Sequence, residues 1–238
     1  MFKAILLFLL LFLLPLSKSP TIATAKDDSS VFPVSELLNG EQLFEEMKLA
    51  GVVNFIAFRQ AVAGYNKILQ KKKSIMTLID FSKPSTEKRL FIFDMKAKKL
   101  LYSSVVSHGR NSGENYAIHF SNEYGSYKSS LGFYLTENTY QGKNGYSLIL
   151  NGLEKGINDR AKERAIVVHG APYANPSVAT SSGRLGRSFG CPALPPSLTK
   201  PIINTIKDGS VLFIYANNKD YLAQSSFLTN QSKAEATL

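Results

Sequence analysis

The chain has 238 residues, of which 44% are hydrophobic, and it carries 28 Lys and Arg residues against 18 Asp and Glu. This length allows one folded domain plus an extension, and the apolar content is enough for a buried core. The single cysteine excludes an internal disulfide. The net charge of +10 suits an acidic partner such as nucleic acid, anionic lipid or cell-wall material, and equally a solvated surface that aids solubility.

The first 25 residues have the pattern of a secretory signal. Lys3 gives a positive start, Ala4 to Leu16 is an almost unbroken apolar run, and Ala23-Thr24-Ala25 offers small residues for cleavage. The apolar run is shorter than the roughly 20 residues that span a bilayer. Residues 1–25 are therefore predicted to be a removed signal peptide, with no stable membrane span left after cleavage. The protein is expected in the periplasm or cell envelope, where nucleic acid is not an expected partner.

Helices are expected ahead of the main body. Residues 26–40 are polar and turn-like, whereas residues 41–70 place apolar side chains at a spacing of three or four. Gly51 is expected to separate the main helix from a shorter one around residues 43–49. Residues 26–73 are thus predicted to form a polar leading segment and a short helical extension packed on the body.

The body that follows is predicted to be mainly β. Short β-branched or aromatic runs, broken by Gly, Pro, Asn and Ser, lie at residues 75–79, 90–93, 100–106, 132–136, 146–150 and 165–168. Their spacing favours a β-sandwich or barrel over alternating strands and helices. One helix is expected around residues 198–206, with Pro201 in its first turn, before a last strand at 211–215. The body is expected to span residues 74–218, and residues 219–238 to be a polar tail.

The sequence Ser188-Phe189-Gly190-Cys191-Pro192 contains the only cysteine. Such a thiol is either buried and inert, reactive, or paired to another chain. The glycine-rich, polar surroundings, with Arg184 and Arg187 nearby, favour a reactive thiolate in a loop. The amide N–H groups of Gly190 and Cys191 are expected to stabilise an oxyanion.

A histidine lies at the end of an apolar run, in Ala165-Ile166-Val167-Val168-His169-Gly170. It is either a satisfied histidine at a strand end or a general base. A thiol ionises near pH 8.5, so an imidazole within hydrogen-bond reach would draw off its proton at neutral pH.

These motifs together resemble a known family. The pair Val168-His169-Gly170 and Ser188-Phe189-Gly190-Cys191 is similar to the HG…SxGC signature of the L,D-transpeptidase catalytic domain, the YkuD-like fold of cell-wall enzymes. The segments Phe120-Ser121-Asn122, Gly125 to Tyr134, Gly152-Leu153-Glu154 and Cys191-Pro192-Ala193 resemble a divergent branch of murein L,D-transpeptidases. The resemblance covers residues 75–215 and implies a β-rich, sandwich-like body with a cysteine nucleophile and neither metal nor cofactor.

The resemblance also implies the roles of the site residues. Cys191 attacks the carbonyl of the third residue of a peptidoglycan stem tetrapeptide and forms a thioester. His169 acts as base and then as acid, the carbonyl of Gly170 orients its imidazole, and Ser188 shapes the turn at Gly190.

The chain departs from the family in two places. Most relatives carry an arginine shortly after the cysteine, where this chain has Pro192-Ala193, and Arg184 or Arg187 is a candidate replacement for its charge. Residues 171–182, a long polar loop between base and nucleophile, are expected to affect access to the site.

Other residues are weaker candidates. His108, Arg187 and Tyr134 are taken as candidate substrate-binding residues, with a structural role as the alternative for His108. His119 is expected to be structural. The three histidines lack the short spacing of a zinc motif, so no metal is expected.

The favoured function is an exported L,D-transpeptidase that acts on peptidoglycan stem peptides, by 3-3 cross-linking or D-amino acid exchange. One alternative is an L,D-carboxypeptidase that uses water as acceptor. The other is a non-catalytic wall-binding protein on the same scaffold. The sequence leaves the choice of acceptor and the oligomeric state open.

Overall fold

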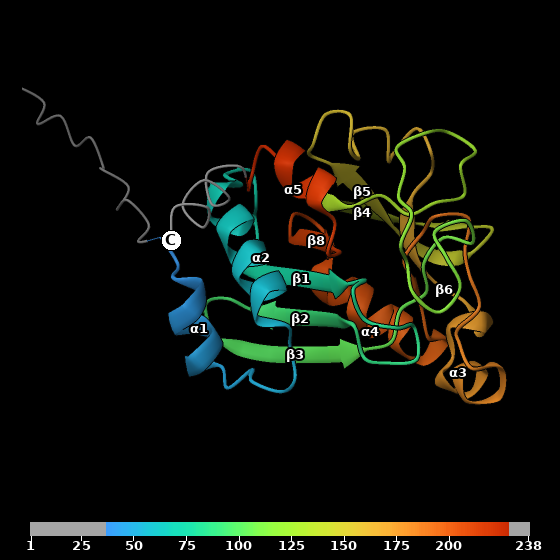
Figure 1. Ribbon diagram of the computed structural model, residues 1–238, viewed down its shortest axis with the longest axis horizontal. Coiled ribbons are helices and arrows are strands. Elements are labelled where there is room, and N and C mark those ends of the chain that lie inside the picture. The colour runs from blue at the N-terminus through green and yellow to red at the C-terminus, as the bar shows by residue number, and fades with distance from the viewer. Residues whose placement is uncertain (1–36, 229–238) are drawn as a thin grey trace, which may run out of the picture. The chain divides into compact units, whose positions relative to one another are not determined.

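A computed structural model of the chain describes residues 37–228 (Figure 1). The predicted signal peptide and the start of the polar leading segment lie outside this range, as does the end of the predicted tail. The described part contains eight strands: β1 (Ile75–Asp80), β2 (Leu90–Asp94), β3 (Lys99–Ser104), β4 (Gly132–Gly142), β5 (Gly145–Gly152), β6 (Val167–Gly170), β7 (Ala193–Leu194) and β8 (Val211–Tyr215). The prediction of a mainly β body is confirmed.

All eight strands belong to one mixed sheet in the order β3-β2-β1-β8-β4-β5-β6-β7. The pairs β1–β8 and β6–β7 are parallel, and the others are antiparallel. The last long strand in the chain, β8, lies near the centre, between β1 and β4. All five of its residues are buried, as expected for a continuous apolar run in a central strand.

The predicted helical extension forms two helices, α1 (Gly40–Glu46) and α2 (Phe55–Lys67), each capped at its N-terminus by an asparagine side chain. Helix α2 contacts β1 and β8 and buries Phe58 and Val62 in the main core (Figure 1). At Gly64 an added Cβ would collide with the ring of Phe133. The extension therefore packs directly on the sheet.

Besides β7, three helical elements lie between β6 and β8. The expected polar loop at residues 171–182 contains a 3-10 turn, η1 (Pro172–Ala174), and helix α3 (Pro176–Ser182). Helix α4 (Pro196–Ile206) begins earlier than predicted, so Pro201 lies inside it rather than in the first turn. Its buried face still carries Ile202, Ile203 and Ile206, as the spacing indicated.

The predicted polar tail was wrong for its first ten residues, which pack on the body. Helix α5 (Lys219–Gln224) buries Tyr221, and Leu228 is buried beyond it. The hydroxyls of Tyr221 and Ser225 donate to the carboxylate of Glu154, which is itself buried. Because a buried carboxylate needs hydrogen-bond donors, this contact holds the segment in place despite its polar composition. Among residues 37–228, no helix is long and apolar enough to cross a membrane.

Candidate active site

The two predicted reactive residues lie on adjacent elements at one edge of the sheet. Strand β6 ends at His169 and Gly170, and it pairs in parallel with β7, so that His169 lies beside Ala193. The His169 amide is 3.4 Å from the carbonyl oxygen of Pro192. Cys191 precedes this pair in the same turn, so the sheet brings the histidine and the cysteine together.

The imidazole of His169 is held by its own strand end. Its Nδ1 lies 3.0 Å from the carbonyl oxygen of Gly170, and because a carbonyl only accepts, Nδ1 carries the proton. The Nε2 atom is then the basic nitrogen. Burial lowers the pKa of His169, which keeps the ring neutral at neutral pH. The contact expected for the Gly170 carbonyl is present.

Gly170 also explains why a glycine follows the histidine. An added Cβ there would collide with the side-chain oxygen of Thr199 on α4. The absence of a side chain lets helix α4 approach the end of β6, and this close packing fixes the backbone that carries His169.

The thiol of Cys191 faces the backbone just before β6. Its Sγ donates to the carbonyl oxygen of Ala165 at 3.6 Å and accepts from the amide of Val167 at 3.5 Å. Within residues 37–228, no hydrogen bond joins this thiol to His169, so the direct contact that the sequence predicted is missing from this conformation. Burial raises the pKa of Cys191, and the Val167 amide opposes that rise. Burial therefore favours the neutral form of both the thiol and the imidazole.

Ser188 and Gly190 shape the turn before the cysteine. The Ser188 hydroxyl donates to the carbonyl oxygen of Cys191 at 2.6 Å and accepts from the Gly190 amide at 3.1 Å. Gly190 has φ +128°, and an added Cβ would stand 2.8 Å from Ile166 and 2.9 Å from the carbonyl of Lys128. Only glycine fits this position without strain.

This arrangement changes the expected oxyanion site. The Gly190 N–H, which was predicted to stabilise an oxyanion, is already bound to Ser188. The Cys191 N–H makes no hydrogen bond to another residue in the described part of the chain. Of the two amides predicted to stabilise an oxyanion, it is the one left without a partner in that part.

Arg164 is a site residue that the sequence reasoning missed. Its guanidinium donates to the carbonyls of Ser121 and Lys128 and to the hydroxyls of Ser126 and Ser130, at 2.5 to 3.2 Å. Its positive charge lowers the pKa of Cys191, although by less than burial raises it. The Nε atom of Arg164 is buried and makes no hydrogen bond within residues 37–228. No sequence motif marks this arginine. It follows the charged residue Glu163 and comes shortly before strand β6.

The two arginines that were expected to assist the thiol have a different partner. Arg184 and Arg187 both pair with Glu114, at 2.9 and 2.7 Å. Arg187 also donates to the carbonyls of Gly113 and Arg110. Arg184 also donates to the carbonyl of Leu185. The arginine whose charge lowers the pKa of Cys191 is instead Arg164.

Two predicted substrate-binding residues lie in the interior. His108 is only 1% exposed, and its ring contacts Arg89 at 2.8 Å and the carbonyl of Gly113 at 3.2 Å. Burial and the Arg89 charge lower its pKa to about 3. Tyr134 is fully buried and donates to the carbonyl of Ser130. Neither side chain has surface left for a substrate, so both assignments are corrected to structural roles.

The backbone of His108 does take part in the turn. Its carbonyl accepts from the Ser188 amide at 2.9 Å, and the next residue, Gly109, packs against Gly190. Ser129 closes the other side, because its hydroxyl donates to the carbonyl of Gly190 at 3.0 Å. The turn is thus held from two segments that lie far from it in the sequence.

An aromatic pair borders the same turn. Phe189 is 64% exposed although it is large and apolar, and its ring lies 4.7 Å from that of Tyr127. The guanidinium of Arg110 lies 5.8 Å from the Phe189 ring. The two rings and Arg110 thus give the turn before Cys191 an apolar and basic border. His119, expected to be structural, is exposed.

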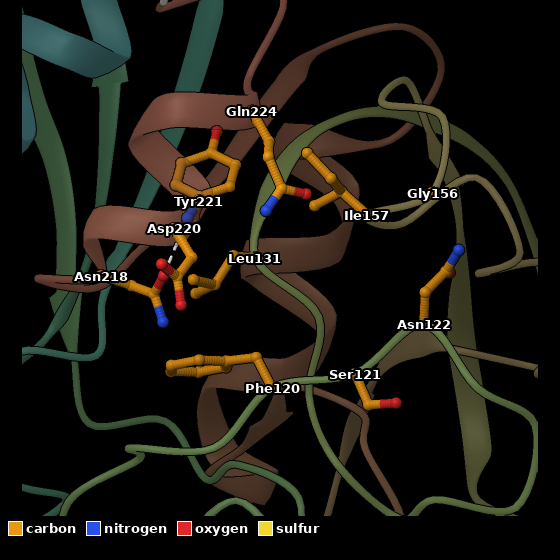
Figure 2. Close-up of a pocket in the computed structure, with 10 residues that line it drawn as sticks. All are labelled: Phe120, Ser121, Asn122, Leu131, Gly156, Ile157, Asn218, Asp220, Tyr221 and Gln224. Atoms are coloured by element: carbon orange, nitrogen blue, oxygen red, sulfur yellow. Dashed lines mark hydrogen bonds between the residues drawn. The ribbon is translucent and has the colours of Figure 1, made fainter. Parts of the chain in front are cut away.

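The cavity drawn in Figure 2 is separate from the His169 and Cys191 side chains. It lies between residues 120–122 and the segment around α5, and neither His169 nor Cys191 lines it.

Comparison with protein families identifies one match. A family model described as the L,D-transpeptidase catalytic domain matches residues 49–215. A comparison with curated proteins gave no match.

Several solved structures are similar to the chain. They include an L,D-transpeptidase from Mycobacterium smegmatis, with 12% identity, a TM-score of 0.38, and coverage of 60% of this chain and 59% of that one. An L,D-transpeptidase from Stackebrandtia nassauensis has 14% identity, a TM-score of 0.37, and coverage of 76% and 77%. The helical cell shape determining protein Pgp2 from Campylobacter jejuni has 15% identity, a TM-score of 0.38, and coverage of 75% and 62%. The chain thus spans less than two thirds of the first of these structures.

Proposed function

This chain belongs to the L,D-transpeptidase catalytic domain family, and from that membership we propose that it transfers acyl groups between peptidoglycan stem peptides through a thioester on Cys191. The observation that supports this most is the pairing of β6 with β7, which sets His169 beside the turn that carries the only thiol of the chain. A binding protein would have no need for a buried, oriented imidazole at that position.

The acylation step begins with the thiol proton. The thiol of Cys191 breaks its hydrogen bond to the carbonyl of Ala165 and transfers its proton to Nε2 of His169. This produces a thiolate and an imidazolium. The thiolate attacks the carbonyl carbon of the third stem residue, and the Cys191 N–H stabilises the oxyanion that forms. The C–N bond to the terminal D-alanine then breaks. Its amine takes the proton back from His169, leaving a neutral imidazole and a thioester.

The transfer step reverses this proton movement. An acceptor amine gives a proton to His169 and attacks the thioester carbonyl, the C–S bond breaks, and the thiolate recovers the proton. The product is a new amide between the third stem residue and the acceptor. If the acceptor is a second stem peptide, the product is a 3-3 cross-link, and if it is a free D-amino acid, the product is an exchanged tetrapeptide.

The proposed location is the periplasm or cell envelope, where peptidoglycan lies. This part of the proposal rests on the signal-like residues 1–25, which are outside the described range. The net positive charge agrees with a polyanionic wall as the surroundings of the protein.

The test is an analysis of products by mass spectrometry. Purified protein is incubated with disaccharide-tetrapeptide, with and without a millimolar D-amino acid. The proposal predicts cross-linked dimer or exchanged tetrapeptide, and no product from Cys191→Ala at an unchanged circular dichroism spectrum. Tripeptide as the only product, at a yield that the added amine does not change, would mean a carboxypeptidase instead.

A further inference from the structure

Two neighbouring cavities form one groove away from the nucleophile. The first, in Figure 2, has a volume of about 230 Å³ and lies between residues 120–122 and 218–224. The second has a volume of about 300 Å³ and lies between residues 116–120 and 216–218. Phe120 and Asn218 line both, so the cavities adjoin. We refer to them together as the Phe120 groove.

The groove carries polar groups without internal partners. The carboxylate of Asp220, the amide of Gln224 and Nδ2 of Asn218 make no hydrogen bond within residues 37–228, although Oδ1 of Asn218 caps α5 through the Tyr221 amide. Figure 2 shows the Asn218 and Asp220 side chains on the same side of the cavity, above Phe120, with Gln224 reaching in from α5. The side-chain N–H groups of Asn218 and Gln224 and the carboxylate of Asp220 are therefore free to bind a ligand.

The charge of the groove excludes an anionic ligand. None of the described residues that line either cavity is Lys, Arg or His, although the chain carries 28 Lys and Arg residues. Asp220 is the one charged residue in the lining. A phosphate or carboxylate would be repelled there, whereas a neutral ligand rich in hydroxyl and amide groups would find partners.

Aromatic rings supply an apolar surface in the same groove. Phe120 stacks on Phe81, with centroids 6.4 Å apart and planes 11° from parallel, and Tyr116 is half exposed beside them. A pyranose ring has C–H groups on its faces and hydroxyl or acetamido groups around its edge. Aromatic faces bury the C–H groups, and free amides and carboxylates bind the hydroxyl and acetamido groups.

We propose that the Phe120 groove binds an N-acetylated sugar of the glycan strand that carries the stem peptide. This inference rests on the proposed function, because it takes peptidoglycan as the substrate. It adds a sugar-binding site to a reaction in which only the peptide is chemically changed.

The position of the groove relative to the nucleophile fits this substrate. Ser121 lines the cavity in Figure 2, and its carbonyl accepts from Arg164. The other end of that guanidinium lies 3.6 Å from the place that a Cβ on Gly190 would occupy. One arginine side chain therefore connects the groove wall to the nucleophile turn. The three residues from the sugar to the reacting carbonyl span about 10 Å when extended.

The experiment compares two substrates in steady-state kinetics, disaccharide-tetrapeptide and the free tetrapeptide. For the wild-type protein we expect a KM about tenfold lower with the disaccharide, which corresponds to one or two net hydrogen bonds. In Asp220→Ala/Gln224→Ala this preference should disappear, while KM and kcat for the free tetrapeptide stay unchanged. The matched control is Glu87→Ala/Gln141→Ala, which removes one exposed carboxylate and one exposed amide elsewhere.

A binding measurement separates this proposal from the proposed function. The disaccharide without peptide is titrated into the ¹⁵N-labelled protein, and the side-chain amide signals of Asn218 and Gln224 should shift, whereas that of Gln141 should not. The site is refuted if the double variant retains the preference for the disaccharide, or if the shifts fall outside the groove. If the wild type turns over neither substrate, the proposed function fails, and the titration still decides whether the groove binds sugar.

Discussion

The thiol of Cys191 donates to the carbonyl oxygen of Ala165, 3.6 Å away, and Ala165 has a left-handed backbone with φ +54°. A left-handed conformation is sterically unfavourable for alanine. The carbonyl of Ala165 therefore points to the thiol despite the backbone preference of this residue. The structure thus holds the Cys191 thiol in a hydrogen-bonded state. In the proposed mechanism, the thiol leaves this carbonyl and reaches His169.

The pH dependence of the thiol follows from this state. Burial raises the pKa of Cys191 and lowers that of His169, so the neutral pair predominates at neutral pH. A raised thiol pKa leaves less thiolate at any given pH. Alkylation of Cys191 by iodoacetamide should therefore accelerate with pH, with a midpoint above the value of about 8.5 for a free thiol. A rate that is already constant below pH 6 would indicate a thiolate–imidazolium pair and contradict this prediction.

His169→Ala should remove the base that generates the thiolate. General-base assistance is worth roughly 10² to 10⁴ in rate, so kcat/KM for tetrapeptide should fall by about that factor at neutral pH. The matched control is His119→Ala, because His119 is exposed and is not at the turn. Equal losses in the two variants would remove His169 from the mechanism.

Arg164→Gln should raise the pKa of Cys191 further, because it removes the positive charge that lowers it. An opposite charge nearby favours the thiolate, so the alkylation profile should move to higher pH when that charge is removed. Arg164→Lys keeps the charge and should recover most of the shift. Arg160→Gln is the control, since Arg160 is on the same segment but pairs with Glu163 and Glu123 at the surface. An unmoved profile in Arg164→Gln, with activity lost, would assign Arg164 a structural role only.

Tyr221→Phe tests whether the segment after β8 belongs to the folded body. The change removes a donor to the buried carboxylate of Glu154, which should cost about 1 to 3 kcal/mol of unfolding free energy. Tyr146→Phe removes a similar hydrogen bond to Asn204 at an exposed position and should change stability by less than about 0.5 kcal/mol. Urea unfolding gives both values. Equal stabilities would mean that α5 is not held by Glu154.

The strands were predictable, and the two candidate reactive residues could be singled out, because each leaves a local signal. An alternating or continuous apolar run indicates a strand, and a histidine at a strand end or a cysteine in a glycine-rich turn stands out within a few positions. Gly190 illustrates this, because its positive φ requires a residue type that is visible in the sequence.

What the sequence did not reveal depends on contacts between distant segments. Arg164 acts through hydrogen bonds to residues 121–130, and α5 is held by Glu154, more than 60 positions earlier in the chain. His108 lies beside a buried arginine that no motif marks, so its burial was not predictable. The hydrogen bond between the thiol and the carbonyl of Ala165 depends on the side-chain rotamer of Cys191, which the sequence does not specify.

The central claim, a thioester on Cys191, is tested most directly by the intact mass of the protein during turnover. The protein is mixed with tetrapeptide, quenched in acid within seconds and analysed by mass spectrometry. Our account predicts one added acyl group with the mass of the tripeptide less one water, located on Cys191 by digestion, released by hydroxylamine and absent in Cys191→Ala. Full turnover of tetrapeptide by Cys191→Ala, without any covalent adduct on the protein, would contradict it.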